Sequence, residues 1–197
     1  MERKGSVKRK TSETDISLEL VLESSNKSEI SSGVPFFDHM LESMSKHGRF
    51  YLNVSCTGDR EVDDHHTVED VGITLGMAFK QALADKAGII RFGDATIPMD
   101  DALTMIAVDL SGRPYFKYTG PILNSFIGPY SEELTDEFLR AFAMNAGINL
   151  HVVVLSGQNM HHVHETIFKA LGLALYKASA KDDFLQGSVL STKGTIV

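Results

Sequence analysis

One short motif, two adjacent histidines followed by a glutamate three residues after the second, occurs twice in this chain. It reads HHTVE over residues 65–69 and HHVHE over residues 161–165, 96 residues further along. Identities continue at the same spacing through the segment that follows, at Leu75 and Leu171, Gly76 and Gly172, Ala78 and Ala174, Ala82 and Ala178, and Ala84 and Ala180. A repeat of this length predicts two copies of one structural unit.

The segments around the two motifs also correspond between the halves. They predict helices over 35–47, 66–84, 131–146 and 162–180, and strands over 15–23, 48–54, 103–110, 114–118 and 147–153. The order strand, strand, helix, strand, helix, twice, indicates an α+β protein with an internal duplication. We expect half-repeats over 1–92 and 93–197, with the seam near 86–98. Because no Pro/Ser-rich linker separates them, they should pack as one compact unit.

Composition excludes several classes of protein. The chain has 197 residues, a net charge of −7 and a pI near 5.6, so a basic nucleic-acid-binding surface is not expected. No apolar run approaches the ~18 residues of a membrane span. The lone Cys56 excludes an intrachain disulfide and a thiolate metal site, and a reducing, cytoplasmic setting fits best. The basic residues 1–10 are interpreted as the frayed start of a strand, with a transit peptide as the weaker alternative.

The repeated motif suits a metal site. On a helix, its first histidine and its glutamate lie about 40° apart and can hold one ion together. The second histidine points sideways, so the adjacent histidines more naturally serve two ions. Imidazole and carboxylate ligands suit manganese, iron or zinc. Adjacent histidines also occur on plain solvated surfaces, but two copies at corresponding places favour a metal role.

Two further histidines are candidate ligands. His39 opens an expected helix, with Asp38 beside it as a candidate partner that would orient an imidazole. His151 lies in an expected strand ten residues before the second motif; a buried core role is its alternative. Together with the motifs these give eight donors, enough for two sites of three histidines and one glutamate. His47 and His164 are left over, and we expect His164 to be a bystander.

Basic and hydroxyl side chains form a second candidate set. Arg91 follows an apolar turn, Arg113 follows a strand and a glycine, and Lys169 lies two turns beyond His161 on the same expected helix. Residues 191–194, of sequence STKG, form the kind of polar turn that binds phosphate. Each of these residues could be an ordinary surface group. Near a metal centre in an acidic protein, they indicate a phosphorylated substrate.

The chain resembles the imidazoleglycerol-phosphate dehydratases, lyases of histidine biosynthesis. The matching stretches span nearly the whole chain: RKTSETDI at 9–16, GVPFFDHML at 33–41, GD at 58–59, DDHHTVED at 63–70, RFG at 91–93, PMDDAL at 98–103, VDLSGRPY at 108–115, NMHHVHE at 159–165, FKA at 168–170 and STKG at 191–194. One departure is His164, which stands where the family usually has an apolar residue.

The resemblance implies a helical layer packed between two four-stranded sheets, two Mn²⁺ ions per active site, and a homo-oligomer of 24 subunits whose sites form where subunits meet. One ion would take His65, His151, His161 and Glu165, and the other His39, His66, Glu69 and His162. Substrate contacts would fall to Glu13, Arg91, Arg113, Lys169, Ser191 and Lys193.

The implied reaction is the dehydration of imidazoleglycerol phosphate to imidazole acetol phosphate, a hydro-lyase step. No carbonyl activates the carbons that lose water, so we expect an imidazolate or diazafulvene-type intermediate, stabilised by the two ions. Glu13 is the first candidate for the catalytic carboxylate, with Glu165 and Glu69 as metal-bound alternatives and Asp100 as a reserve.

Two other classes of function use part of the same set. A metal-dependent hydrolase would use the same ligands but would split its substrate rather than remove water from it. A metal-storage or metal-sensing protein would need the ligands but not the basic residues.

Overall fold

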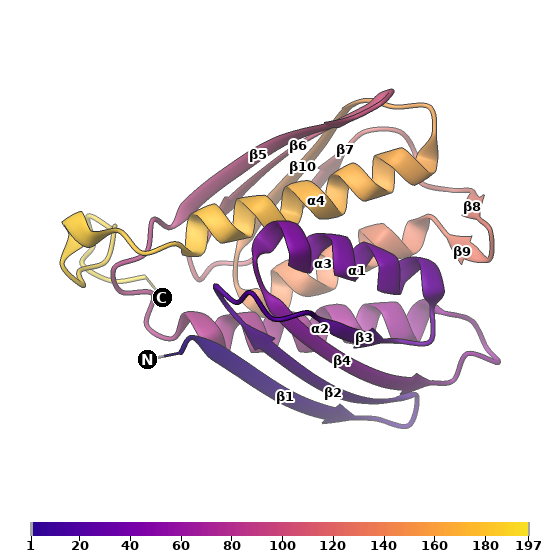
Figure 1. Ribbon diagram of the computed structural model, residues 1–197, viewed down its shortest axis with the longest axis horizontal. Coiled ribbons are helices and arrows are strands. Elements are labelled where there is room, and N and C mark those ends of the chain that lie inside the picture. The colour runs from indigo at the N-terminus through magenta and orange to yellow at the C-terminus, as the bar shows by residue number, and fades with distance from the viewer. Residues whose placement is uncertain (1, 197) are drawn as a thin grey trace.

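The computed structural model describes residues 2–196, and these form three layers, with four α-helices between two β-sheets (Figure 1). The first half contains β1 (Lys4–Lys10), β2 (Thr14–Val21), β3 (Glu29–Ser31), α1 (Pro35–Gly48), β4 (Tyr51–Gly58) and α2 (His65–Leu83). The second half contains β5 (Phe92–Met99), β6 (Ala102–Asp109), β7 (Tyr115–Thr119), the short hairpin β8 (Phe126–Ile127) and β9 (Tyr130–Ser131), α3 (Glu133–Ala146), β10 (Asn149–Ser156) and α4 (Met160–Ser179). A 3₁₀ turn, Asp183–Leu185, follows.

The two large sheets share one topology, which confirms the predicted α+β fold and its duplication. Their strand orders are β1-β2-β4-β3 and β5-β6-β10-β7, and in each only the last pair is parallel. In each half three strands of the large sheet precede the first helix, one more than the sequence pattern indicated. The basic N-terminal segment is not a frayed start, because β1 pairs in register with β2 along its whole length. Strand β5 occupies the expected seam.

The helices of the middle layer all run in the same direction, so their N-terminal ends share one end of the molecule (Figure 1). Helix α1 packs along α4, and α3 packs along α2. The repeated glycines explain how closely these pairs approach. A Cβ atom on Gly172 would lie 2.2 Å from the carbonyl oxygen of Met44, and one on Gly76 would lie 2.7 Å from that of Phe142. The identity at this repeat position is therefore a packing requirement.

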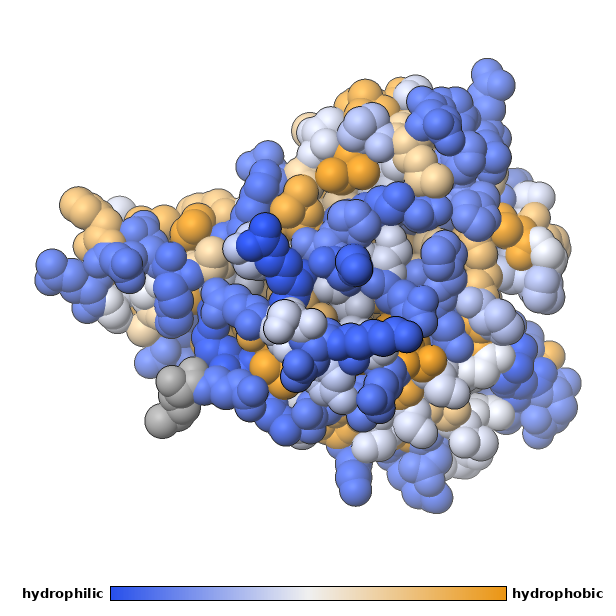
Figure 2. Space-filling view, in the orientation of Figure 1, coloured by the Kyte–Doolittle hydropathy of each residue, from blue (hydrophilic) through white to orange (hydrophobic). Residues whose placement is uncertain are grey.

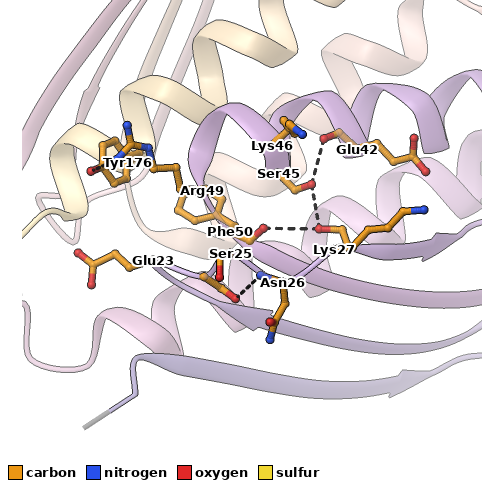
Figure 3. Close-up of a pocket in the computed structure, with 12 residues that line it drawn as sticks. Glu23, Ser25, Asn26, Lys27, Glu42, Ser45, Lys46, Arg49, Phe50 and Tyr176 are labelled. Atoms are coloured by element: carbon orange, nitrogen blue, oxygen red, sulfur yellow. Dashed lines mark hydrogen bonds between the residues drawn. The ribbon is translucent and has the colours of Figure 1, made fainter.

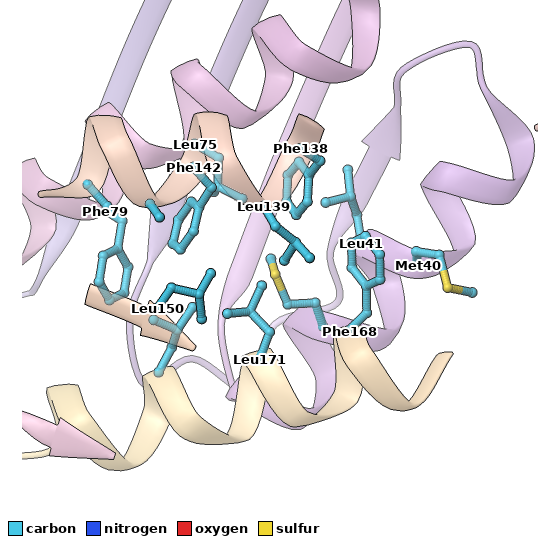
Figure 4. Close-up of a cluster of buried hydrophobic side chains, with 14 of the residues drawn as sticks. Met40, Leu41, Leu75, Phe79, Phe138, Leu139, Phe142, Leu150, Phe168 and Leu171 are labelled. Carbon is cyan, nitrogen blue, oxygen red and sulfur yellow. The ribbon is translucent and has the colours of Figure 1, made fainter. Parts of the chain in front are cut away.

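Apolar side chains from both halves enter one buried cluster between the sheets (Figure 4). At its centre Phe138 of α3 stacks on Phe168 of α4, with ring centroids 5.3 Å apart. The repeated leucines Leu75 and Leu171 are both buried in the same cluster. Burial of this continuous apolar face holds the four helices at fixed positions, and so fixes the side chains at their N-terminal ends. None of the helices in residues 2–196 has both the length and the apolar character to cross a membrane.

Candidate functional site

Three candidate metal ligands meet where the N-terminal ends of α1 and α4 lie side by side. His39 of α1, His161 of α4 and Glu165 of α4 each offer one donor atom, and the three atoms lie within 4.8 Å of one another. The Nε2 atom of His161 is 3.4 Å from Glu165 Oε2, and that of His39 is 4.0 Å from it. The histidine and glutamate of the second motif share a helix face, as their spacing predicts, and the packing of α1 on α4 adds the third donor.

The first motif places its histidine and glutamate in the same way on α2. His65 Nε2 lies 4.0 Å from Glu69 Oε2, and both side chains are partly exposed. A small pocket of about 350 Å³ opens beside His65, between the start of α2 and the β8–β9 hairpin. The space beside His65 and Glu69 could therefore admit further metal ligands from another copy of the chain.

The second histidine of each motif is held by a carboxylate at Nδ1. His66 Nδ1 lies 3.0 Å from Asp59, and its Nε2 lies 3.7 Å from Glu13. His162 Nδ1 lies 2.8 Å from Asp101, and its Nε2 lies 3.7 Å from Asp100. In both copies the carboxylate fixes the orientation of the ring, and Nε2 lies near a second carboxylate.

These contacts shift the protonation equilibria of the groups concerned. The hydrogen bond to Asp59 raises the pKa of His66 above its ordinary value. Asp101 accepts hydrogen bonds from the backbone N–H groups of Asn159 and Gln158 as well as from His162, and these lower its pKa. Asp59 and Asp101 were not among the predicted site residues. Asp101 lies 61 positions from His162, so no local spacing could indicate the contact.

Glu165 also contacts Lys169, one turn further along α4. The ammonium nitrogen of Lys169 lies 2.9 Å from Glu165 Oε1. Partial burial of Glu165 acts to raise its pKa, but the hydrogen bond and charge of Lys169, together with His39 and His161, outweigh burial and lower the pKa. Glu165 is therefore ionised near neutral pH, as a metal ligand must be.

One smaller expectation needs correction. Asp38 does not orient an imidazole; its Oδ1 accepts hydrogen bonds from the backbone N–H and the hydroxyl of Ser32, just before α1. His164, expected to be a bystander, lies in the interior of the protein. Its side chain is completely buried, and burial lowers its pKa to about 4.

The candidate phosphate-binding residues, Lys169 apart, lie at the other end of the helical layer. The backbone N–H of Arg91 donates to the carbonyl of Ala178, 17 residues after His161 on α4. At 1.5 Å per residue this separates Arg91 from His161 by about 25 Å along the helix. The guanidinium of Arg91 pairs with Asp109, at 2.7 Å, and donates to the carbonyl of Leu190, which places Ser191 and Lys193 at the same end. One chain therefore cannot bring both sets of residues to one small substrate.

Arg113 and His151 also lie away from the metal ligands. Arg113 is next to the start of β10, where Asn149 donates to its carbonyl. His151 is exposed on the outer face of its sheet, whereas its neighbours Leu150 and Val152 face the helices. The alternative of a buried core role for His151 is therefore wrong. The outward position separates it from every other candidate ligand of its own chain.

A wide groove of about 970 Å³ lies elsewhere, at the C-terminal end of α1 (Figure 3). It is lined by the loop from Glu23 to Ser28, by Arg49 and by Tyr176, and Arg49 lies over the ring of Tyr176. None of the residues predicted from the sequence as site residues lines this groove. The candidate chemistry thus belongs to the two ends of the helical layer and not to the groove.

Comparison with known proteins gives the family. The family model described as imidazoleglycerol-phosphate dehydratase matches residues 32–175. This chain belongs to the imidazoleglycerol-phosphate dehydratase family. Imidazoleglycerol-phosphate dehydratases of Acetivibrio thermocellus and Desulforamulus reducens are 54% and 50% identical to it over 196 residues, with complete coverage of both chains in each case. The prediction of an enzyme of the dehydratase class is confirmed at this level.

Solved structures of the family share the fold. The imidazoleglycerol-phosphate dehydratase of Pyrococcus furiosus, solved in complex with (S)-C348, matches with a TM-score of 0.83 and 36% identity, over 96% of this chain and 99% of its own. That of Staphylococcus aureus matches with a TM-score of 0.82 and 34% identity, over 91% and 99%. The duplicated three-layer architecture is therefore that of imidazoleglycerol-phosphate dehydratases.

Proposed function

We propose that this chain removes water from imidazoleglycerol phosphate to form imidazole acetol phosphate, in histidine biosynthesis, at a site that two Mn²⁺ ions complete. The observation that carries the proposal is the meeting of His39, His161 and Glu165, within 4.8 Å of one another, in a chain of this family. Two imidazole nitrogens and an ionised carboxylate are a donor set that suits a divalent ion such as manganese.

The resemblance groups His39 with His66, Glu69 and His162. Our proposal follows instead the contacts within one chain, where the neighbours of His39 are His161 and Glu165. We therefore assign His39, His161 and Glu165 to one ion, and His65 and Glu69 to the other. The side chains of His66 and His162 are partly exposed and that of His151 is exposed, and we assign them to complete the two sites from neighbouring copies. When bound, the ions supply Lewis acidity, which favours negative charge on the imidazole ring.

The protein's own groups bind and orient the substrate and move a proton. Glu13 is the proposed proton acceptor, because its side chain is 47% exposed beside His66 and no ion is assigned to it. Lys169, Arg113, Ser191 and Lys193 bind the phosphate through charge-assisted hydrogen bonds. Arg91 orders the C-terminal segment, because its guanidinium donates a hydrogen bond to the Leu190 carbonyl. The parallel helix N-termini add a positive potential that favours an anionic substrate. The imidazolate or diazafulvene-type intermediate is part of this proposal.

The proposal requires assembly. Because the metal ligands and most of the phosphate-binding residues lie about 25 Å apart in one chain, a complete site needs one end from each of two copies. Both ends expose large apolar side chains, including Phe126 at the hairpin and Phe184 at the 3₁₀ turn, which are 69% and 91% exposed. Figure 2 shows apolar side chains on the surface at the end that bears the C-terminal segment. We propose a homo-oligomer of 24 subunits, in the cytoplasm.

The test is turnover of imidazoleglycerol phosphate by protein stripped with a chelator and then given Mn²⁺. The proposal predicts no turnover after stripping, recovery with Mn²⁺, and a product that has lost one water and kept all its carbon and phosphorus. Particle size should fall on stripping, because the ligands converge from more than one copy. A split substrate would indicate a hydrolase instead. Metal binding with no turnover and no phosphate-dependent ligand binding would indicate a storage or sensing protein.

A further inference from the structure

Three buried side chains form a series of hydrogen bonds next to the first turn of α4, and the proposed chemistry does not use them. His164 Nδ1 lies 2.8 Å from the hydroxyl of Thr135, in the first turn of α3. That hydroxyl lies 3.0 Å from the phenol oxygen of Tyr130 on β9. All three side chains are completely buried. These hydrogen bonds therefore connect the β8–β9 hairpin, α3 and α4.

Helix α1 reaches the same cluster through Phe36, three residues before His39. The ring of Phe36 lies 4.9 Å from that of Tyr130 and 6.0 Å from that of His164, measured between centroids. It also lies 5.3 Å from the ring of His161. The elements that supply His39, His161 and Glu165 are thus joined at one buried point directly behind those donors.

Packing alone does not explain a histidine at this position. The equivalent residue of the first motif is Val68, which is also completely buried. An apolar side chain thus fills the corresponding place there. The Nε2 atom of His164 is buried with no hydrogen-bond partner among residues 2–196, and such a group is unfavourable to bury. The hydrogen bond to Thr135 is what the histidine adds and a valine could not supply.

We propose that His164 is a positioning residue: its hydrogen bond to Thr135 fixes the first turn of α4 so that His161 and Glu165 meet His39. The inference rests on the proposed function, since it takes these three residues as metal ligands. His164 lies between His161 and Glu165 on the same turn, so any rotation of that turn moves all three. A hydrogen bond accepts only a narrow range of distance and angle, whereas an apolar contact tolerates sliding.

The experiment compares Mn²⁺ affinity, measured by titrating chelator-stripped protein, across single substitutions. Thr135→Val removes the hydroxyl and keeps the shape, and His164→Leu removes the imidazole and stays apolar. Thr135→Ser keeps the hydroxyl. Thr74→Val removes another buried helical hydroxyl, one bonded to the Asp70 carbonyl and not part of this chain of hydrogen bonds, and serves as the matched control. Unfolding of each metal-free variant is measured alongside.

We expect Thr135→Val and His164→Leu each to weaken Mn²⁺ binding by about tenfold, the size of effect seen when partners of metal ligands are lost. Thr135→Ser and Thr74→Val should bind Mn²⁺ as the wild type does. Metal-free Thr135→Val should be somewhat less stable than Thr74→Val, because it leaves His164 Nδ1 and the Tyr130 hydroxyl without their shared partner. The double variant Thr135→Val/His164→Leu should bind Mn²⁺ no more weakly than the weaker-binding of the two single variants, because both changes break the same hydrogen bond.

Wild-type Mn²⁺ affinity in Thr135→Val would overturn the positioning role, and that variant decides the matter should His164→Leu fail to fold. A stability loss in metal-free Thr135→Val well beyond that of Thr74→Val, with unchanged Mn²⁺ affinity, would show a purely structural role. Failure of the wild-type protein to bind Mn²⁺ or to turn over substrate would instead overturn the proposed function, so the two failures are distinguishable.

Discussion

The imidazole of His162 donates a hydrogen bond from Nδ1 to Asp101, 2.8 Å away, and the same arrangement recurs in the first half between His66 and Asp59. The duplication has therefore preserved a carboxylate that orients the second histidine of each motif, as well as the motif itself. A histidine held at Nδ1 presents Nε2 in a fixed direction, which is the usual arrangement behind a metal-binding imidazole.

Asp101→Asn should weaken Mn²⁺ binding by about 10- to 100-fold, because the ring of His162 loses its charged partner. Substrate affinity measured at saturating Mn²⁺ should change little. Asp15→Asn is a suitable control, since Asp15 is exposed and forms an ion pair with Lys10, away from the histidines of both motifs. Equal Mn²⁺ affinities in the two variants would show that the contact with His162 does not serve metal binding.

Lys193→Ala or Arg113→Ala should weaken substrate binding while metal content stays normal. A lost charge-assisted phosphate contact is worth about 1.5–3 kcal/mol, so affinity should fall roughly ten- to a hundredfold. Lys177→Ala is the matched control, because the Lys177 ammonium group donates to the Asp94 carbonyl instead. Loss of metal together with affinity would show that these residues do not act on the phosphate.

Glu13→Gln should lower turnover by about 10²–10⁴, the usual effect of losing a general base. The amide keeps the size of the side chain, so manganese content, assembly and substrate affinity should stay near normal. Steady-state kinetics with metal analysis checks this. Turnover within about threefold of the wild type would move the role to Glu165 or Glu69.

His164 should make the metal-free protein less stable in mild acid. Its pKa is about 4 in the folded chain and about 6.5 when unfolded. Between these values the unfolded chain binds more protons, so stability is complete above about pH 6.5 and falls as pH drops toward 4. The shift corresponds to about 3 kcal/mol. Denaturant unfolding at pH 7 and pH 4.5 should show a smaller pH effect in His164→Leu than in the wild type, and equal pH effects would contradict the assignment.

Helices and strands whose apolar residues recur at a regular spacing could be predicted from the sequence, and the other elements could not. Helices over 66–84 and 162–180 were expected, and α2 and α4 span His65–Leu83 and Met160–Ser179. Strand β1 was expected only as a frayed strand start, because its outer face carries Lys4, Lys8 and Lys10 and its sequence resembles a charged tail. Strand β5 was missed because it contains a glycine and a proline. The glycine, Gly93, is required there, since a Cβ would lie 2.1 Å from the carbonyl oxygen of Ala174.

Within the candidate site, the contact between His161 and Glu165 could be predicted from the sequence, and the contact of His39 with them could not. The spacing of His161 and Glu165 on one helix face follows from helix geometry alone. That His39 joins them depends on α1 packing against α4, a contact between distant segments that leaves no periodic signal. For the same reason the Asp101–His162 contact and the burial of His164 became evident only in the fold.

The central claim is that the phosphate-binding residues of each active site, Lys169 apart, come from a different copy of the chain than His161 and Glu165. Co-expression of Glu165→Gln and Lys193→Ala chains with different tags, followed by purification of mixed particles, tests it. Each variant alone should have little activity at limiting substrate, because Lys193→Ala weakens substrate binding and Glu165→Gln removes a metal ligand. In mixed particles, random assembly should leave roughly a quarter of the sites with both ends intact, so dehydratase activity should return to about that fraction of the wild type. Mixed particles no more active than the two parents would contradict the claim.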